Sequence, residues 1–404
     1  GGAARPLHVC CCVLPWAGHM LPMLRVARAL AAREAVGRVS YLTDAFGAAR
    51  VRSWLEAEAD GTGKIRVLGL EDGYSKGLDD EVCRSLASGE EGSAPDVNVL
   101  IELNAGAHLE RLASEERVRY FVVDWCSYGF SACLSAQGLD YCVSMPTSEL
   151  VARHLCGQGG SDPAAAAGCA SMRRAAEGLR GRAVLVHSLP GMLGGAGPEA
   201  PEGLAARLEL VGLVARPSAE PRLPAHVAAF LARPGPPVVY ASLGTMAHLS
   251  RDQLGRLAAG LGAPGEWRVL WALRPELAAL LPGDLGPDFL VEDWLPQAEI
   301  LDHPGCAAAL LHGGWGAACE AVACGKPFCA LPLFGDHAMN AAILSSMGMC
   351  KVVGVPRGAH AASRRPLEAL DAQELRSDLR QLLSDAGYAA AARRWQQAAQ
   401  ARPE

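Results

Sequence analysis

Two polar side chains that could carry out acid–base chemistry each follow an apolar run. His19 ends the loop Pro15–His19 after the run Leu7–Leu14, and apolar residues at helical spacing come next. Asp124 directly follows the run Tyr120–Val123. If this carboxylate reaches the ring, it can fix the tautomer of His19 and stabilise the imidazolium that forms when the ring takes a proton. Alternatively, the histidine is a solvated residue at a helix start and the aspartate caps the following helix.

The position of His19 also predicts its charge. The positive end of a helix dipole disfavours an imidazolium in the first helical turn. We therefore expect the ring of His19 to be neutral and able to accept a proton.

A second group of polar residues, in the last third of the chain, has the types needed to bind a nucleotide. Trp294-Leu-Pro-Gln297 follows the strand-like segment Phe289–Val291. An indole in a short loop beyond a strand can offer its face to a planar base. The amide of Gln297 can hydrogen-bond a ribose or the edge of the base.

A glycine-rich turn at the start of an expected helix could hold a diphosphate. It follows the strand-like segment Ala307–Leu311. Backbone N–H groups and the positive dipole end of a helix bind phosphate, and glycines allow a close approach. The predicted diphosphate site consists of His312, Gly314, Trp315, Gly316 and Ala317. Glu320 lies one helical turn further on, where its carboxylate can accept from both hydroxyls of a ribose.

Four more polar residues could complete such a site. Asp336 and His337 follow the strand-like segment Phe328–Leu331 and could bind the hydroxyls of a sugar. Thr147 could also face the sugar, and Thr245 could bind phosphate. Single residues of this group have structural explanations, since a tryptophan can belong to the core and a glutamate to the surface. Such explanations account less well for partners of a base, a ribose, a phosphate and a polyol that follow one another in that order.

Buried strand candidates alternate with helical or turn-rich sequence, which is typical of a parallel, doubly wound α/β sheet. The first series is Leu7–Leu14, Val39–Leu42, Ile65–Leu68, Arg119–Val123, Leu139–Met145 and Ala183–Val186. The second series is Pro237–Leu243, Trp267–Leu273, Phe289–Val291, Ala307–Leu311, Phe328–Leu331 and Lys351–Val355. Ligands of such sheets bind beyond the carboxyl ends of the strands.

The composition divides the chain into domains. Between Leu189 and Pro237 the sequence is rich in glycine, proline and alanine, which indicates a linker. We predict an N-terminal Rossmann-like domain over residues 1–217, a linker over 218–236 and a C-terminal Rossmann-like domain over 237–370. Residues 371–404 should form helices that could pack back on the N-terminal domain.

Charge and cysteine usage exclude several classes of protein. The 404 residues carry a formal net charge of −6, which gives no electrostatic reason to bind nucleic acid or anionic lipid. No apolar stretch approaches the roughly 20 residues of a membrane helix, and we see no signal peptide. The 14 cysteines lie in apolar segments such as Val9–Val13, without zinc spacing. We therefore expect core cysteines, no metal site and a cytoplasmic protein.

These motifs resemble those of the UDP-dependent glycosyltransferases of family 1. The signature box of the plant members starts with Trp-x-Pro-Gln, has a His-Cys-Gly-Trp centre and a Glu, and closes with Asp-Gln. The chain matches this box, with its spacing, as Trp294-Leu-Pro-Gln297, His312-Gly-Gly-Trp315, Glu320 and Asp336-His337. The loop around His19 resembles the catalytic histidine loop of the family, and Asp124 falls where its partner aspartate is expected.

The resemblance implies the GT-B fold, with two Rossmann-like domains facing a cleft, and a displacement with inversion at the anomeric carbon of a UDP-sugar. His19 would be the general base on a hydroxyl of a small, apolar or phenolic acceptor, and Asp124 would orient it. His312 and the N–H groups near Gly314–Ala317 would offset the charge of the leaving UDP. Because the chain has no Asp-x-Asp motif, no metal or other cofactor is expected, and we expect a monomer.

Two departures from the family pattern bear on activity. Gly316-Ala317 stand where plant members usually carry Asn-Ser, which removes two side-chain donors. His337 replaces the closing glutamine, and because some galactose-using members carry histidine there, glucose and galactose both remain open. A GT-B nucleotide-sugar epimerase and a catalytically weak UDP-sugar-binding paralogue are alternative functions. Retention of His19 and Asp124 favours the transferase, because an epimerase does not need an acceptor base.

Overall fold

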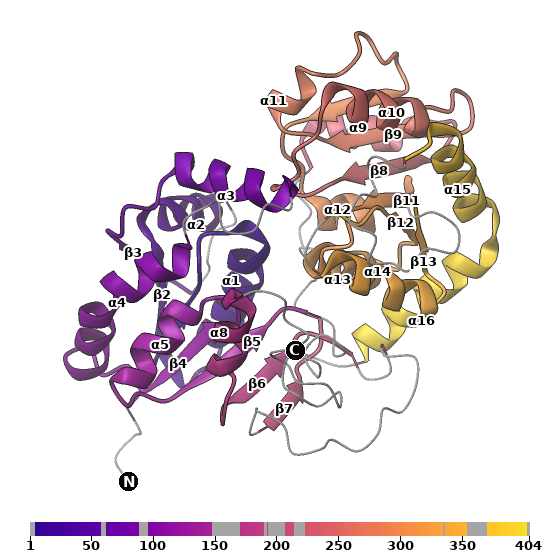
Figure 1. Ribbon diagram of the computed structural model, residues 1–404. Helices are drawn as coiled ribbons and strands as arrows, with labels where there is room; N and C mark the ends of the chain where they lie inside the picture. The colour runs from indigo at the N-terminus through magenta and orange to yellow at the C-terminus, as the bar shows by residue number, and fades with distance from the viewer. Residues whose placement is uncertain are drawn as a thin grey trace. The chain divides into compact units, whose positions relative to one another are not determined.

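The chain forms two compact units, each built around its own parallel sheet (Figure 1). The computed structural model describes residues 5–57, 62–88, 96–147, 170–189, 192, 207–213, 223–333, 336–353 and 370–401. The first unit is built mainly from residues 1–188 and 197–214, and the second from residues 189–196 and 215–403.

The sheet of the first unit has seven strands in the order β3-β2-β1-β4-β5-β6-β7. They are β1 (Leu7–Cys12), β2 (Val36–Asp44), β3 (Ile65–Leu70), β4 (Tyr120–Asp124), β5 (Tyr141–Met145), β6 (Ala183–Val186) and β7 (Arg207–Leu210). All six strands of the first predicted series are confirmed. Strand β7 was not predicted, because the short Arg-Leu-Glu-Leu segment has little apolar character and lies within the stretch from Leu189 to Pro237 that is rich in glycine, proline and alanine.

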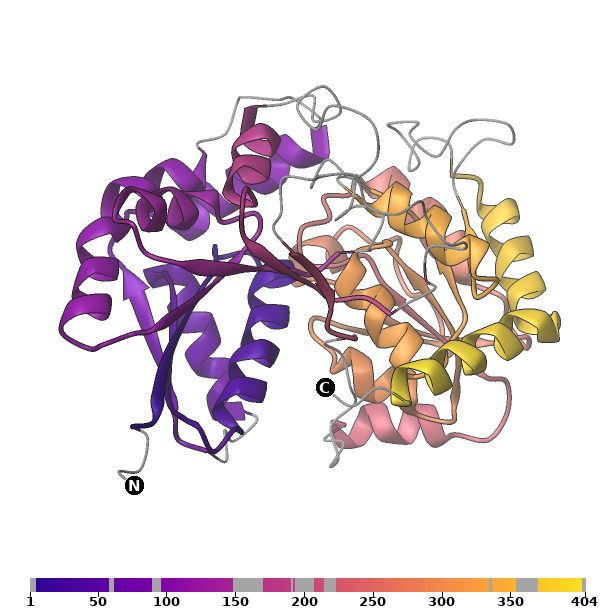
Figure 2. The same ribbon diagram turned by 90° about the horizontal axis from the view of Figure 1, so that it is seen from below.

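Helices cover both faces of this sheet. They are α1 (Ala17–Ala31), α2 (Ala45–Ala57), α3 (Lys76–Ser88), α4 (Val97–Ser114), α5 (Tyr128–Ala136) and α8 (Ala170–Gly178). Successive side chains of a strand point to opposite faces, and those of β1 enter two cores. Cys10 and Cys12 join the core that contains residues of α4 and α5, whereas Cys11 joins the core that contains residues of α1. Figure 2 shows α1 (indigo) and the α4–α5 pair (purple) on opposite sides of the sheet.

The sheet of the second unit has six strands in the order β10-β9-β8-β11-β12-β13. They are β8 (Val238–Ser242), β9 (Arg268–Ala272), β10 (Phe289–Glu292), β11 (Cys306–Leu311), β12 (Phe328–Ala330) and β13 (Cys350–Val352). The helices are α9 (Ala225–Ala232), α10 (Arg251–Leu261), α11 (Pro275–Ala278), α12 (Gln297–Asp302), α13 (Trp315–Ala323), α14 (His337–Ser346), α15 (Ala372–Ser384) and α16 (Ala386–Gln400). The second predicted series of strands is confirmed.

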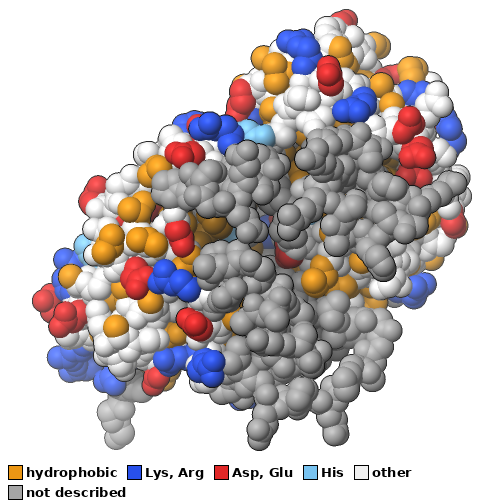
Figure 3. All heavy atoms as spheres, in the orientation of Figure 1, with side chains coloured by type: hydrophobic (Ala, Val, Ile, Leu, Met, Phe, Trp, Pro, Cys, Tyr) orange, Lys and Arg blue, Asp and Glu red, His pale blue; other side chains and the backbone are white. Residues whose placement is uncertain are grey.

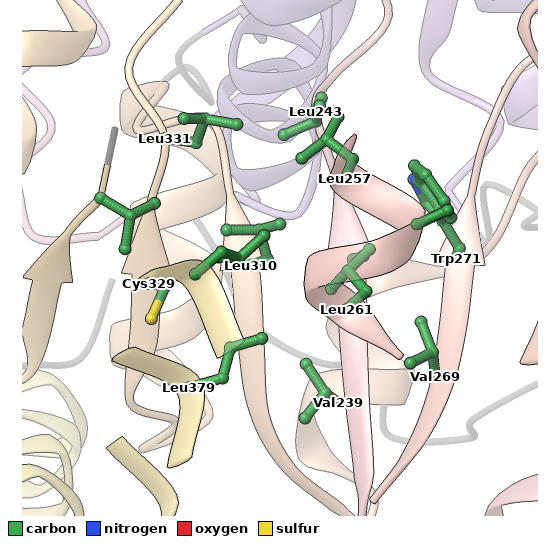
Figure 4. Packing of buried hydrophobic residues seen from close by; sticks show 14 of the residues in the cluster. Val239, Leu243, Leu257, Leu261, Val269, Trp271, Leu310, Cys329, Leu331 and Leu379 are labelled. Atoms are coloured by element: carbon green, nitrogen blue, oxygen red, sulfur yellow. The ribbon is translucent and has the colours of Figure 1, made fainter. Parts of the chain in front are cut away.

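In the core of the second unit, two helices pack against the sheet. Leu257 and Leu261 of α10 and Leu379 of α15 share one buried cluster with Val239 of β8 and Leu310 of β11 (Figure 4). The C-terminal helices thus complete the hydrophobic core of this unit.

Two segments differ in detail from the sequence expectation. Residues 371–404 contain two helices that meet at Asp385, whose side chain accepts from the backbone N–H of Gly387 and caps α16. In the second unit α15 packs against α10, and α16 packs against α13. The stretch 218–236, expected to be a linker, contains α9, and its residues 218–222 lie outside the described part of the chain.

The surface carries both charges. On the face seen in Figure 3, Lys and Arg side chains alternate with Asp and Glu side chains over the described part of each unit. No helix among the described residues is long and apolar enough to cross a membrane.

Candidate active site

The first unit places His19 and Asp124 at the same edge of its sheet. β1 and β4 are neighbours, with Cys12 opposite Val123, and α1 begins at Ala17, soon after β1 ends. The strand order reverses between these two strands, and such a switch point is where doubly wound sheets bind ligands. The fold therefore brings together two residues that are far apart in the sequence.

His19 and Asp124 form a hydrogen bond, with Nδ1 of the ring 2.9 Å from Oδ1 of the carboxylate. The side chain of Asp124 is 1% exposed and that of His19 is 20% exposed. Oδ1 also accepts from the backbone N–H of Cys126 at 3.0 Å and from the hydroxyl of Ser127 at 3.4 Å. The predicted contact is confirmed, and the same carboxylate fixes the turn into α5, so it serves both purposes that the sequence left open.

The charge of His19 differs from the sequence expectation. Burial lowers the pKa of the ring, but its interactions with Asp124 and then with Cys126 outweigh burial and raise the pKa well above its usual value. The expectation of a neutral ring is wrong, because a carboxylate in direct hydrogen-bond contact acts more strongly than the partial charge of a helix end. The resting imidazolium must therefore lose a proton before His19 can act as a base.

Two indoles flank His19, and the sequence analysis missed both. The ring of Trp16 lies edge-on at 6.0 Å between centroids, and that of Trp125 is tilted at 6.5 Å. Nε1 of Trp16 donates to the hydroxyl of Tyr74 at 3.2 Å, which holds this indole in place. Their signal was proximity in sequence, because each stands within three residues of His19 or Asp124. The two indoles give the base an aromatic surrounding.

A thiol completes this group. Nδ1 of His19, a carboxylate oxygen of Asp124 and Sγ of Cys126 lie within 4.8 Å of one another, an arrangement that could hold a metal ion. The sequence showed no such ligand spacing, because the histidine and the cysteine come from loops that follow different strands.

In the second unit, Trp294, which we assigned to the nucleotide base, and Gln297 lie after β10, whereas Glu320 lies on α13 after β11. The side chain of Trp294 is 66% exposed, so its face is open to a ligand. Gln297 is the first residue of α12, and its Nε2 donates to Oε2 of Glu320 at 2.7 Å. The structure thus brings together the two side chains that we assigned to the ribose.

The predicted diphosphate site lies at the switch point of the second sheet, between β8 and β11. α13 has Gly314 as its N-cap residue and no side-chain cap, so the first N–H groups of the helix, including those of Gly316 and Ala317, face outward for an anion. Gly313 has a φ of 82°, which glycine adopts readily. A Cβ atom on Gly316 would meet nothing within 4 Å, so the glycine leaves open space beside this helix end.

His312 and His337 form an edge-to-face pair with their ring centroids 4.8 Å apart. Burial and then the neighbouring His337 lower the pKa of His312 to about 3, and burial lowers the pKa of His337 to about 4. Both rings are therefore neutral at pH 7. His312 can stabilise a leaving diphosphate only as a neutral N–H donor, and the positive potential must come from α13.

Asp336 is joined to the diphosphate loop by a residue that the sequence analysis missed. The amide Nδ2 of Asn340 donates to Oδ2 of Asp336 at 3.0 Å and to the backbone carbonyl of Gly313 at 3.2 Å. Asn340 is fully buried. Its position one helical turn after Asp336 was the available signal.

The positions of three predicted site residues give less direct support for a role in binding the donor. The side chain of Trp315 is 3% exposed and that of Thr147, in the first unit, is fully buried, so neither side chain offers a ligand an open face. A donor contact at Trp315 would be made by its backbone. Thr245 is exposed in the turn after β8, and the preceding Gly244 packs on the ring of His312 so closely that a Cβ atom would lie 2.9 Å from Cε1.

The two doubly wound units define a GT-B protein, and comparison with solved structures agrees. The chain is similar to TcCGT1 in complex with UDP, with a TM-score of 0.76 and 18% identity over 97% of this chain and 94% of that one. It is also similar to UGT2 of Phytolacca americana complexed with UDP-2fluoro-glucose and pterostilbene, with a TM-score of 0.69 and 17% identity over 98% of this chain and 95% of that one.

Sequence comparison finds similarity to one family over part of the chain. Residues 199–389 match the family model of UDP-glucoronosyl and UDP-glucosyl transferase. Anthocyanidin 3-O-glucosyltransferase of Zea mays is 40% identical over 135 residues, which are 31% of this chain and 28% of that protein. UDP-glycosyltransferase 85A1 of Arabidopsis thaliana is 37% identical over 111 residues, 26% of this chain and 22% of that protein. The chain thus spans about a quarter of the length of these curated relatives. The matched part of the chain is thus similar to UDP-glycosyltransferases.

Proposed function

We propose that the protein transfers a hexose, glucose or galactose, from a UDP-sugar to a hydroxyl of a small apolar or phenolic acceptor, with inversion at the anomeric carbon. The observation that carries this proposal is the hydrogen bond of 2.9 Å between His19 and the buried Asp124. A histidine held by a carboxylate at a sheet switch point is the arrangement that an acceptor base requires. The family comparisons support a transferase and give no support to an epimerase or a weak paralogue.

His19 acts as the base through the ring nitrogen that Asp124 does not hold. As its unprotonated Nε2 takes the proton of the acceptor hydroxyl, the oxygen forms a bond to the anomeric carbon of the donor. The bond from that carbon to the β-phosphate oxygen breaks at the same time, and UDP leaves with the electron pair. Asp124 stabilises the imidazolium that results. Transfer requires that the acceptor at His19 reaches a donor held by the second unit.

The second unit holds the donor by its parts. The uracil ring of the donor stacks on the indole of Trp294, and Gln297 and Glu320 bind its ribose. The N-terminus of α13 binds the diphosphate, with the neutral His312 and Thr245 as further donors. Asp336 and His337 bind the hexose. Because the helix end and these side chains meet the charge of the leaving UDP, the proposed transfer needs no metal.

The acceptor class rests on the aromatic surrounding of His19 and on relatives. The related maize protein is an anthocyanidin 3-O-glucosyltransferase, and the related Phytolacca americana structure holds pterostilbene. The ring of a phenol can pack against an indole such as that of Trp16 or Trp125. We also propose a cytoplasmic location and a monomeric state. The cysteines that the structure describes form no disulfide, which is consistent with a reducing compartment.

An acceptor screen tests the proposal. The purified chain is incubated with UDP-glucose or UDP-galactose and a panel of flavonoids, stilbenes and simple phenols, and products are detected by mass spectrometry. We expect at least one phenol to gain a hexose, with a β-anomeric proton in its NMR spectrum. Interconversion of UDP-glucose and UDP-galactose without any glycoside, or binding of UDP without either reaction, would overturn the proposal.

A further inference from the structure

We propose that His19, Asp124 and Cys126 form a site for zinc, and that bound zinc blocks the base of the transferase. The binding site stands on the geometry of the first unit alone, whereas its inhibitory effect rests on the proposed function. Nothing in the family signature assigns a role to Cys126.

The three donor atoms are already gathered. Nδ1 of His19, a carboxylate oxygen of Asp124 and Sγ of Cys126 lie within 4.8 Å of one another. Tetrahedral zinc with N, O and S ligands places its donor atoms about 3.3–3.7 Å apart. Cys126 lies in the turn between β4 and α5, and binding would require its side chain to rotate toward the metal. The remaining position of the metal would hold water, as in zinc sites with three protein ligands.

The hydrogen bonds of Asp124 provide an independent observation in favour of a bound cation. Three donors, the ring of His19, the N–H of Cys126 and the hydroxyl of Ser127, all converge on its Oδ1. Its Oδ2 is buried and has no hydrogen-bond partner within the described part of the chain. A buried carboxylate oxygen without a partner is costly. A cation beside the carboxylate would satisfy this oxygen without disturbing the turn held by Oδ1.

The donor set selects the kind of metal. A thiolate, an imidazole and a carboxylate together suit zinc, whereas calcium and magnesium prefer oxygen ligands. The site is reachable from solvent, since the side chain of His19 is 20% exposed and Cys126 is half-buried. Binding releases the thiol proton of Cys126 and the proton of Nδ1 of His19 to the buffer. Zinc–sulfur and zinc–nitrogen bonds replace the S–H and N–H bonds, so no oxidant or reductant is needed.

Zinc on Nδ1 would stop the proposed base. The metal replaces the proton that His19 shares with Asp124, so the carboxylate no longer balances an imidazolium. Because zinc takes Nδ1 and the ring keeps its remaining proton on Nε2, neither ring nitrogen then has a lone pair that can accept a proton from an acceptor hydroxyl. The same side chains would therefore support sugar transfer in the metal-free protein, and zinc binding to them would inhibit it.

Metal titration of the chelator-treated full chain tests the binding. We expect one equivalent of Co²⁺ to give the near-ultraviolet thiolate charge-transfer band, and Zn²⁺ to displace it. Cys126→Ala should abolish the band and weaken zinc binding, measured against a chromophoric chelator, by at least about 100-fold. Cys142→Ala, which removes a half-buried thiol outside this group, is the matched control. If Cys126→Ala does not fold, Cys126→Ser replaces it, with folding checked by thermal melting.

The outcomes separate this site from the transferase proposal. Absence of the band, or equal zinc affinity in the wild type and the Cys126 variant, would overturn the site whether or not the protein transfers sugar. Where transfer is found, zinc should inhibit the wild type, a chelator should restore it, and the Cys126 variant should lose a smaller share of its own zinc-free rate. Equal inhibition of both proteins would refute the blocking role.

Discussion

At the scale of residues, the pair of His19 and Asp124 is the centre of the proposed chemistry. Asp124→Asn keeps the size of the side chain but removes its charge, so the imidazolium that forms during transfer loses its partner. We expect kcat to fall by at least about 100-fold, within the range for acid–base catalysis. The KM for the UDP-sugar should change little, because the proposed donor-binding residues belong to the second unit. Steady-state kinetics in the presence of a chelator measures both constants.

The matched control for this variant is Asp140→Asn. Asp140 is fully exposed and pairs with Arg182 at 2.9 Å, and exposed ion pairs contribute little to stability. Normal kcat in Asp124→Asn, or an equal loss in Asp140→Asn, would contradict the role of Asp124.

Glu320 offers a second test at this scale. Glu320→Gln should raise the Kd for UDP by about 10- to 100-fold, because a hydrogen bond to a charged acceptor contributes about 1.5–3 kcal/mol. Glu299→Gln, on the same α12 as Gln297, is the control and should bind UDP as the wild type does. Titration calorimetry measures both affinities. Equal affinity in all three proteins would rule out a ribose contact at Glu320.

At the scale of elements, the turn before α13 is held by close packing. A Cβ atom on Gly314 would lie 2.4 Å from Nε2 of His312, whereas one on Gly316 would meet nothing within 4 Å. We expect Gly314→Ala to lower the free energy of unfolding by about 1–3 kcal/mol through overpacking. Gly316→Ala should raise it by up to about 1 kcal/mol, because alanine favours a helix. Denaturant unfolding that ranks the two variants in the opposite order would contradict this description of the turn.

The end of β2 carries a pH-dependent contribution to stability. Burial raises the pKa of Asp44 to about 6, the hydrogen bond from the N–H of Gly47 opposes this shift, and Asp72 adds to it. Between pH 4 and 6 the folded state thus holds a proton that the unfolded state has released, so stability falls as the pH rises. The loss attributable to this group is at most about 3 kcal/mol.

The variant Asp44→Asn isolates this effect. Its amide can still accept from Gly47 but does not titrate. We expect the unfolding free energy of the wild type to fall more steeply between pH 4 and 6 than that of the variant. Parallel curves over this pH range would show that Asp44 ionises normally in the folded protein.

At the scale of the whole molecule, each unit has a polar loop at the switch point of its sheet. His19 and Asp124 lie there in the first unit, between β1 and β4, and the diphosphate loop lies there in the second, between β8 and β11. This much could be predicted, because long apolar strands such as β1 and β11 have a strong signal and their following loops hold the polar residues. The shared position of His19 and Asp124 follows from that topology alone.

Other features depend on contacts that no local pattern reveals. The charge of His19 is set by a residue from another strand, and the approach of Cys126 to that ring depends on the same tertiary contact. Helix α9 lies in proline- and glycine-rich sequence that resembles a linker. The break between α15 and α16 depends on one capping residue, Asp385, within a continuous helical composition.

The His19→Ala variant shows whether sugar transfer depends on the imidazole of His19. The measurement is the rate of β-glycoside formation from a UDP-hexose and the best phenol of the acceptor screen, followed by mass spectrometry with His108→Ala as a control histidine on α4. We expect His19→Ala to lose at least about 100-fold in rate, while its UDP binding and thermal unfolding stay close to those of the wild type. Glycoside formation at the wild-type rate without the imidazole would contradict it.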